Sequence, residues 1–409
     1  MPPPPPSPIR LLRSHSAQVN VIHFSPTDDE ANERLYTGDS DGLVVVTSTR
    51  SFRALASWQA HTKGILGIEE WKSSILTHGR DNKIHVWARV IALGRLAETA
   101  AQQDLAIPEC LYSLDVNALN FCRFSLLPAS IAETEAYLAV PNLIESSLVD
   151  IWTLPSRQRL HAAIGKIPGP IVQDPWNTLG RGNKNTGSIM SLHLMSVPHP
   201  SSSSKAPHLR VLTAYENGGV CLWAYTKDDD AISIEGCGWE ALWQVKAHVE
   251  SVMALAVTSS HDFAISVSAD HLLARYSLKD GLTVGVGEED PSATQPPGRV
   301  VVHKTKYPGN GTVAIRPDGK VFAVGSWDGK IRLYSIKSFK ALGTLSYHTG
   351  VCQALAFARP CTSESHADVA DEDEDDFGSS ERERRSRWLA SGGVDKRVAI
   401  WELLTFEQK

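Results

Sequence analysis

The feature that most constrains this chain is a spacing of six residues between a polar turn residue and an aromatic residue, which recurs along the sequence. Each polar residue precedes an alternating run such as KIHVW, GVCLW, KIRLY or RVAIW. Alternation with period two predicts a β-strand that follows a tight turn. The pairs are Asp81/Trp87, Ser146/Trp152, Asn217/Trp223, Asp270/Tyr276, Asp328/Tyr334 and Asp395/Trp401, with a weaker first copy at Asp41/Thr47. Seven copies in 409 residues indicate a chain built from one repeated unit.

Several copies also contain a histidine near the start of the unit and a serine or threonine four residues before the aspartate. This is the pattern of a WD40 blade, in which the aspartate accepts hydrogen bonds that keep its buried charge partnered. We therefore predict an all-β, seven-bladed WD40 β-propeller with structural networks in its blades. Three copies hold the full set: His61, Thr77, Asp81 and Trp87; His248, Ser266, Asp270 and Tyr276; His348, Ser391, Asp395 and Trp401.

The other four copies depart from this pattern. The first keeps a histidine, a threonine and an aspartate but lacks the aromatic residue, with His15, Thr37, Asp41 and Thr47 at the four places. Three more copies are degenerate, with Ser146, Asn217 and Val324 where the pattern has Asp, Asp and Ser/Thr.

The predicted organisation is a disordered proline-rich tip at residues 1–8 and a single propeller at residues 9–409. The last strand of the seventh copy, Val398 to Trp401, lies near the end of the sequence. We therefore expect Ile9 to Ser14 to supply the outer strand of the last blade, which closes the ring and covers a free sheet edge. Long insertions are predicted at residues 88–109, 165–187, 196–207, 225–241, 281–298 and 362–387, the first of them with a short helix.

Composition argues against several classes of function. A net charge of −6 gives no general attraction for nucleic acid, and no apolar stretch is long enough to span a membrane. The start, MPPPPPSP, lacks the features of a secretion signal. The six cysteines show no C-x-x-C spacing, which favours reduced thiols in an intracellular protein.

Catalytic, metal and phosphate sites can each be weighed against a structural interpretation. The His–Asp pairs recur in several copies, whereas an active site is needed only once, so we expect no catalytic residues. His78, Asp81 and His85 are close in sequence, but strand alternation places near neighbours on opposite faces, so no metal or other cofactor is predicted. The glycine-rich run LGRGNKNTGS lacks the lysine of a phosphate-binding loop.

Two other features are candidates for partner binding. Trp176 and Trp239 fall in predicted loops, where an indole ring can either anchor a partner or fix its own loop to the propeller. The insertion at 362–387 carries DEDEDD followed by ERERRSR. Such charge blocks are usually solvated, although they can also bind a basic partner.

The chain also resembles a known family. The segments SHSAQVNVIHF, RLYTGDSDGLVVVTSTR, SWQAHTKGILGIEEW and ILTHGRDNKIHVW near the start, with LASGGVDKRVAIWEL near the end, are similar to the fungal ASTRA-associated protein 1 family of WD-repeat proteins. That family is related to animal G-protein β-subunit-like proteins. The resemblance extends over nearly the whole chain and is most specific at its two ends.

The resemblance implies a non-enzymatic scaffold subunit of the nuclear ASTRA complex, linked to chromatin remodelling. Its implied partners are the triple-T co-chaperone, RuvB-like ATPases and a large phosphatidylinositol-kinase-like pseudokinase. It further implies a role in assembly or stability of such kinases. An alternative is a substrate receptor or histone-peptide reader in another nuclear complex, which would use the same fold. The residues themselves do not distinguish the direct partner or the binding face.

Overall fold

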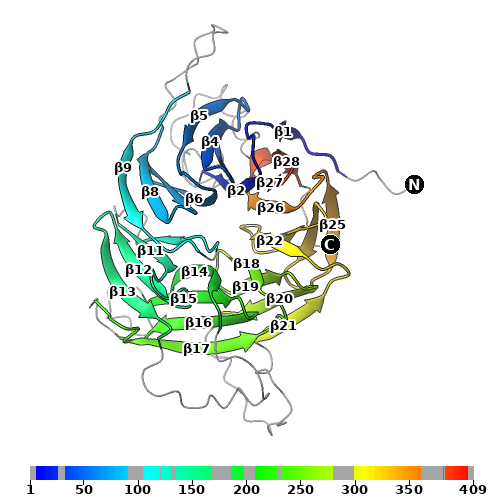
Figure 1. The fold of residues 1–409 in the computed structure, drawn as a ribbon. Helices are drawn as coiled ribbons and strands as arrows, with labels where there is room; N and C mark the ends of the chain where they lie inside the picture. The colour runs from blue at the N-terminus through cyan, green and yellow to red at the C-terminus, as the bar shows by residue number, and fades with distance from the viewer. Residues whose placement is uncertain are drawn as a thin grey trace, which may run out of the picture. The chain divides into compact units, whose positions relative to one another are not determined.

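A computed structural model describes residues 6–25, 33–90, 105–119, 121–129, 135–166, 186–197, 208–227, 232–279, 299–360, 381 and 383–403. It contains seven four-stranded antiparallel sheets, here called blades one to seven (Figure 1). The chain divides into two compact units, residues 1–115 with 311–409 and residues 116–310. Each unit is described separately below.

The first unit holds four blades, almost entirely within its residues. Blade one consists of β2 (Val19–Phe24), β3 (Arg34–Asp39), β4 (Leu43–Ser48) and β5 (Ala54–Gln59). Blade two consists of β6 (Ile65–Trp71), β7 (Ser74–Gly79), β8 (Lys83–Ala88) and β9 (Cys110–Asp115). Blade six consists of β22 (Asn310–Ile315), β23 (Val321–Ser326), β24 (Lys330–Ser335) and β25 (Ala341–Ser346). Blade seven consists of β26 (Cys352–Phe357), β27 (Trp388–Gly393), β28 (Val398–Glu402) and β1 (Arg10–Leu12).

The second unit holds the other three blades. Blade three consists of β10 (Ser125–Pro128), β11 (Ala136–Pro141), β12 (Val149–Leu154) and β13 (Gln158–Ile164). Blade four consists of β14 (Ile189–Val197), β15 (His208–Tyr215), β16 (Gly219–Tyr225) and β17 (Trp239–Lys246). Blade five consists of β18 (Val252–Val257), β19 (Phe263–Ser268), β20 (Leu272–Ser277) and β21 (Val300–Lys304).

These sheets are the blades of a seven-bladed β-propeller, which confirms the predicted fold class. The predicted closure by the amino-terminal strand is also confirmed, because β1 is the outer strand of blade seven (Figure 1). Arg10 pairs with Ile400 and Leu12 pairs with Val398. The pairing places β1 over the edge of β28, which would otherwise present unpaired backbone groups.

The second strand of each blade is buried on both faces. In β23 and β27 every residue is buried, and most of these residues are apolar or small. Outer strands alternate instead, as in β17, where Trp239, Trp243 and Val245 are buried between exposed residues. Blade packing therefore follows the period-two pattern from which the strands were predicted.

The insertion predicted at 88–109 loses only its first residue, Ala88, to β8, and the structure shortens three others. β14 continues through Val197, so the insertion predicted at 196–207 begins after it. β16 ends at Tyr225 and β17 begins at Trp239, so both ends of the insertion predicted at 225–241 are strand residues. These predictions were wrong because the flanking strands are longer than a minimal blade strand requires.

The third shortened insertion is the charged one, residues 362–387. Its last residues contact the body of blade seven, because Leu403 donates a backbone hydrogen bond to the carbonyl oxygen of Arg387 at 3.0 Å and Arg385 is buried. Residues 1–5, the helix expected within 88–109, and most of the insertions at 165–187 and 281–298 lie outside the described residues. Within the described part of the chain, no helix has the length and apolar character needed to cross a membrane.

Candidate functional site

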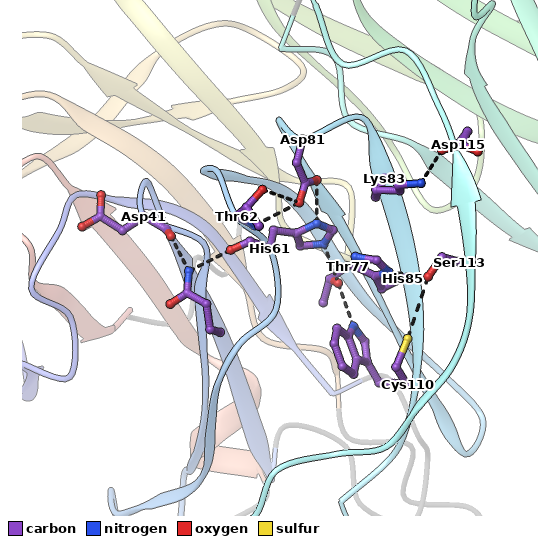
Figure 2. A network of polar contacts seen from close by, with 12 residues as sticks. Asp41, His61, Thr62, Thr77, Asp81, Lys83, His85, Cys110, Ser113 and Asp115 are labelled. Atoms are coloured by element: carbon purple, nitrogen blue, oxygen red, sulfur yellow. Dashed lines mark hydrogen bonds and ion pairs between the residues drawn. The ribbon is translucent and has the colours of Figure 1, made fainter.

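The three predicted blade networks are each assembled by the fold. In blade two, Nδ1 of His61 lies 2.9 Å from Asp81 and Nε2 lies 2.8 Å from the hydroxyl oxygen of Thr77 (Figure 2). That hydroxyl oxygen also accepts a hydrogen bond from the indole nitrogen of Trp87 at 2.8 Å. The backbone nitrogen of Thr62 donates to Asp81 at 3.0 Å. The carboxylate is therefore partnered from two directions.

Blades five and seven repeat this arrangement. His248 bridges Asp270 at 3.2 Å and Ser266 at 2.7 Å, and Ser266 lies 3.0 Å from the hydroxyl group of Tyr276. In blade seven, the distances from His348 are 3.0 Å to Asp395 and 2.8 Å to Ser391, and Trp401 donates to Ser391 at 2.9 Å. The networks differ in detail, but all join the loop before the first strand of a blade to its second and third strands.

These serines have the order of a Ser-His-Asp triad but not its accessibility. The Ser266 and Ser391 side chains are fully buried, and each hydroxyl oxygen is also bonded to an aromatic residue. A nucleophile must reach an incoming carbonyl group, which these hydroxyl groups cannot do without opening the blade. The arrangement therefore acts as an internal cross-link between strands.

In blade one, the structure replaces the expected acid. His15 bonds Thr37 at 2.7 Å as expected, but its other nitrogen lies 2.9 Å from Asp39, two residues before Asp41. Asp39 lies inside β3 and also accepts hydrogen bonds from the backbone nitrogens of Asp41 and Leu43, each at 3.0 Å. Burial would raise the pKa of Asp39, but the bonds from His15 and the backbone outweigh it and lower this pKa. The assignment of Asp41 was wrong because the spacing selects Asp41, whereas the carboxylate that reaches His15 belongs to Asp39 at the end of β3.

The degenerate blades use other partners. In blade three, Asn117 donates to the Ser146 hydroxyl oxygen at 3.0 Å. In blade four, Trp223 donates to Thr213 at 3.1 Å. In blade six, Arg332 forms an ion pair with Asp328 at 2.5 Å. The blade-three bond reaches from the loop before the first strand to the turn between the second and third strands, whereas the blade-four and blade-six contacts lie within the hairpin of the second and third strands.

Sequence reasoning missed a buried ionic cluster between blades one and two. Glu70 in β6 accepts hydrogen bonds from Arg34 at 2.9 Å, from Arg89 at 3.2 Å and from the hydroxyl group of Tyr36. The Glu70 side chain is fully buried and the Arg34 side chain is nearly so. The signal available in the sequence was the pair Glu69–Glu70 inside an otherwise apolar strand.

The two tryptophans predicted as partner anchors have different outcomes. Trp239 is the first residue of β17 and is only 7% exposed. Its ring packs against His161 at 5.2 Å and Tyr225 at 5.5 Å between centroids. The prediction that Trp239 anchors a partner was therefore wrong. The strand begins earlier than expected and directs the indole ring into the hydrophobic core of its own unit. Trp176 lies outside the described residues.

His78 provides a test of how burial controls pH dependence. Burial, and to a smaller extent the neighbouring His61, lower the pKa of His78 to about 3. The unfolded chain takes up a proton near pH 6.5, whereas the folded chain does not until far lower pH. The contribution of His78 to stability is therefore fully present above about pH 6.5 and decreases as the pH falls towards 3.

Lowering the pH from about 7.5 to about 5 is expected to reduce the free energy of unfolding by about 2 kcal/mol through His78 alone. Urea unfolding at the two pH values measures this difference. In the variant His78→Asn the difference should shrink by the same amount, whatever the absolute stability of the variant. An unchanged difference would show that His78 titrates normally in the folded protein.

Four exposed apolar side chains lie in two loops of blade three that a hydrogen bond joins. The side chains are 76% exposed at Leu119, 57% at Phe121, 57% at Leu143 and 94% at Ile144. We call these four residues the blade-three apolar surface. Single exposed apolar residues are common, but a group of this size on adjoining loops is typical of a binding surface.

Hydrogen bonds hold the two loops in place. Asn117 donates to the carbonyl oxygen of Asn142 at 2.8 Å, which ties one loop to the other. The side-chain oxygen of Asn142 accepts from the backbone nitrogens of Ile144 and Glu145 at 3.0 and 2.9 Å. Asp150, which is buried, accepts from the Asn142 amide at 2.9 Å. The loops that carry the apolar side chains are thus held in place by hydrogen bonds.

Comparison with known proteins supports both the fold and the relationship. Residues 304–335 match the family described as WD domain, G-beta repeat. The chain is 31% identical to ASTRA-associated protein 1 from Verticillium alfalfae, over 97% of this chain and 93% of the relative. It is 30% identical to ASTRA-associated protein 1 from Pyricularia oryzae, over 98% of this chain and 97% of the relative.

The chain belongs to the ASTRA-associated protein 1 family. The resemblance given by the terminal segments is thereby confirmed over nearly the full length. The chain is also 27% identical to guanine nucleotide-binding protein subunit beta-like protein 1 from Mus musculus, over 98% of this chain and 97% of that protein.

Proposed function

We propose that this chain is a non-enzymatic WD-repeat scaffold subunit of the nuclear ASTRA complex. In this proposal it acts in chromatin remodelling and in the assembly or stability of phosphatidylinositol-kinase-like kinases. Its partners are the triple-T co-chaperone, RuvB-like ATPases and the phosphatidylinositol-kinase-like pseudokinase of the assembly. The observation that carries the proposal is the similarity to proteins named ASTRA-associated protein 1 over nearly the whole of both chains.

The structure adds physical support in two ways. The networks that resemble catalytic groups are closed within the blades, which leaves them a structural role. The blade-three apolar surface offers contact area of the kind that protein partners bury, and its loops need little ordering on binding because they are already hydrogen bonded. We propose that a protein subunit of the assembly contacts this surface.

Replacing Leu143 and Ile144 with aspartate is expected to reduce co-purification of the assembly subunits by about 10-fold or more, since a buried unpaired charge costs several kcal/mol at an interface. The measurement is affinity purification of the tagged chain from its native cells, with quantitative mass spectrometry of the recovered subunits. The melting temperature of the variant should stay close to that of the parent, because both side chains are exposed.

The matched control replaces Ile232 and Ile234 with aspartate, since these residues are also exposed isoleucines in the same unit. The control should leave recovery unchanged. Equal recovery with the Leu143/Ile144 variant would remove the blade-three apolar surface from the proposal. Absence of triple-T components with the unaltered chain, in preparations that retain other complexes, would contradict the assembly itself.

A further inference from the structure

Blade two carries a group of side chains that the other complete blades do not. A ring nitrogen of His61, a carboxylate oxygen of Asp81 and a ring nitrogen of His85 all lie within 4.8 Å of one another. The two imidazole rings face each other with centroids 4.6 Å apart (Figure 2). The sequence suggested His78 as the companion of Asp81, but His78 pairs with Ile84 and lies on the other face of the sheet. His61, from the loop before β6, takes that place.

The second nitrogen of each histidine already has a partner. Nε2 of His61 lies 2.8 Å from the Thr77 hydroxyl oxygen, and Nδ1 of His85 lies 2.6 Å from the Ser113 hydroxyl oxygen. In the described part of the chain, Nε2 of His85 has no hydrogen-bond partner. Histidines that bind metals usually donate their other N–H to such an oxygen, which fixes the tautomer and aims the free lone pair. Both histidines meet this condition.

The hydrogen bond between His61 and Asp81 does not prevent metal binding, because the proton on Nδ1 can be relocated. If the proton sits on Nε2, it is donated to Thr77, and the Thr77 hydroxyl group can donate elsewhere. The equivalent threonines of blades one and four, Thr37 and Thr213, do so to a carbonyl oxygen across the blade, at 3.3 and 3.2 Å. The shift keeps His61 neutral and frees Nδ1 as a ligand.

The other blades show that His85 is an addition to the structural network. His85 lies across the strand pair from Thr77, and the matching residues are Ala274 across from Ser266 and Ala399 across from Ser391. Those blades form the same network without an imidazole at this position. A role in holding the blade therefore does not account for His85.

In blade six, a positively charged residue occupies the position that corresponds to His85. Arg332 occupies the place that corresponds to His85 and pairs with Asp328, the residue that corresponds to Asp81. In that blade the protein's own cation satisfies the aspartate. In blade two the neighbouring Lys83 pairs instead with Asp115 at 2.6 Å, on the outer strand. A cation from solution can therefore take, beside Asp81, the place that the Arg332 guanidinium takes beside Asp328 in blade six.

From this geometry we propose that His61, Asp81 and His85 form a binding site for a first-row divalent cation that accepts nitrogen ligands, such as Zn²⁺. Two imidazole nitrogens and one carboxylate oxygen are a common set of three zinc ligands, with water or a group from a partner in the fourth position. Thr77 and Ser113 orient the two histidines. The bound cation links the loop before β6 to β8 and so stabilises blade two.

The test uses the full chain freed of metal with a chelator, and Zn²⁺ and Co²⁺ as probes. Titration calorimetry should give one saturable site for Zn²⁺, and Co²⁺ should develop the visible absorption of a four-coordinate complex. The melting temperature should rise with Zn²⁺ concentration, because the cation binds the folded state. His85→Ala should abolish these effects. Ser113→Ala should weaken binding by about 10- to 100-fold, the usual effect of removing such an orienting group.

Control variants separate this site from unspecific surface binding and from misfolding. His271→Ala removes an exposed histidine beside the corresponding aspartate of blade five and should bind Zn²⁺ like the unaltered chain. His85→Ala should fold, since alanine occupies this place in blades five and seven. Should it fail to fold, His85→Arg provides the blade-six arrangement and should likewise not bind. Unaltered Zn²⁺ affinity in the folded His85 variant would overturn the proposal, as would absence of a 1:1 site in the unaltered chain up to about 100 µM Zn²⁺.

Discussion

Replacing Glu70 with glutamine is expected to lower the free energy of unfolding by about 3–5 kcal/mol, since removing one charge from a buried ion pair leaves the other uncompensated. Two guanidinium groups, from Arg34 and Arg89, form ion pairs with this carboxylate, and the hydroxyl group of Tyr36 donates a hydrogen bond to it. The three partners come from β3 and from the residue after β8, so the effect should reach both blade one and blade two.

Urea unfolding followed by tryptophan fluorescence measures the change. The control is Glu33→Gln, which removes the carboxylate of the more exposed pair with Arg50 and should cost less than about 1 kcal/mol. If the two variants are equally stable, the Glu70 cluster contributes no more than a surface ion pair. The pKa of Glu70 is held below its ordinary value because the bonds from Arg34 and Tyr36 outweigh the effect of burial. The cluster is therefore charged at neutral pH.

Deleting Ile9 to Ser14 is expected to lower the free energy of unfolding by about 3–5 kcal/mol, from lost backbone hydrogen bonds and the lost burial of Leu12. The deletion removes β1 and leaves the edge of β28 without its partner strand. Exposed edges of this kind pair with other chains, so aggregation should increase as well.

Thermal unfolding and light scattering of the deletion variant test this prediction. The control Arg10→Ala keeps the strand backbone and removes only an exposed side chain that lies over Phe52 at 5.1 Å. It should change the free energy of unfolding by less than about 1 kcal/mol. A melting temperature that the deletion leaves unchanged would contradict a stabilising role of β1 in blade seven.

The blade pattern could be read from the sequence because its determinants are local. The spacing from Asp81 to Trp87 and the alternation of KIHVW fix a turn and a strand within one short segment. Closure by β1 also followed, because a blade without an outer strand leaves an edge that some other segment must cover. The ends of the strands were not predicted as well. The sequence placed Trp239 in a loop, whereas β17 begins at this residue.

Contacts between distant segments could not be read in the same way. The spacing pattern selects Asp41, but the fold brings the carboxylate of Asp39 to His15, because β3 ends at Asp39 and directs that side chain towards the histidine. Nothing in the sequence around Glu70 indicates that Arg34 and Arg89 contact it in the fold. The same holds for the loops that carry Leu119 and Ile144, which a hydrogen bond from Asn117 joins in the fold.

The sequence by itself determined the repeat, the all-β propeller and the three complete blade networks, because each depends on residue types at fixed spacing within a repeat. Only the tertiary structure decided which side chains are buried and which meet across strands. It moved Trp239 into a core, exposed the blade-three apolar surface, and placed His61 rather than His78 beside Asp81 and His85. Packing and strand register bring together residues that are far apart in the chain. The spacing of residues within one repeat does not indicate which of these distant residues come into contact.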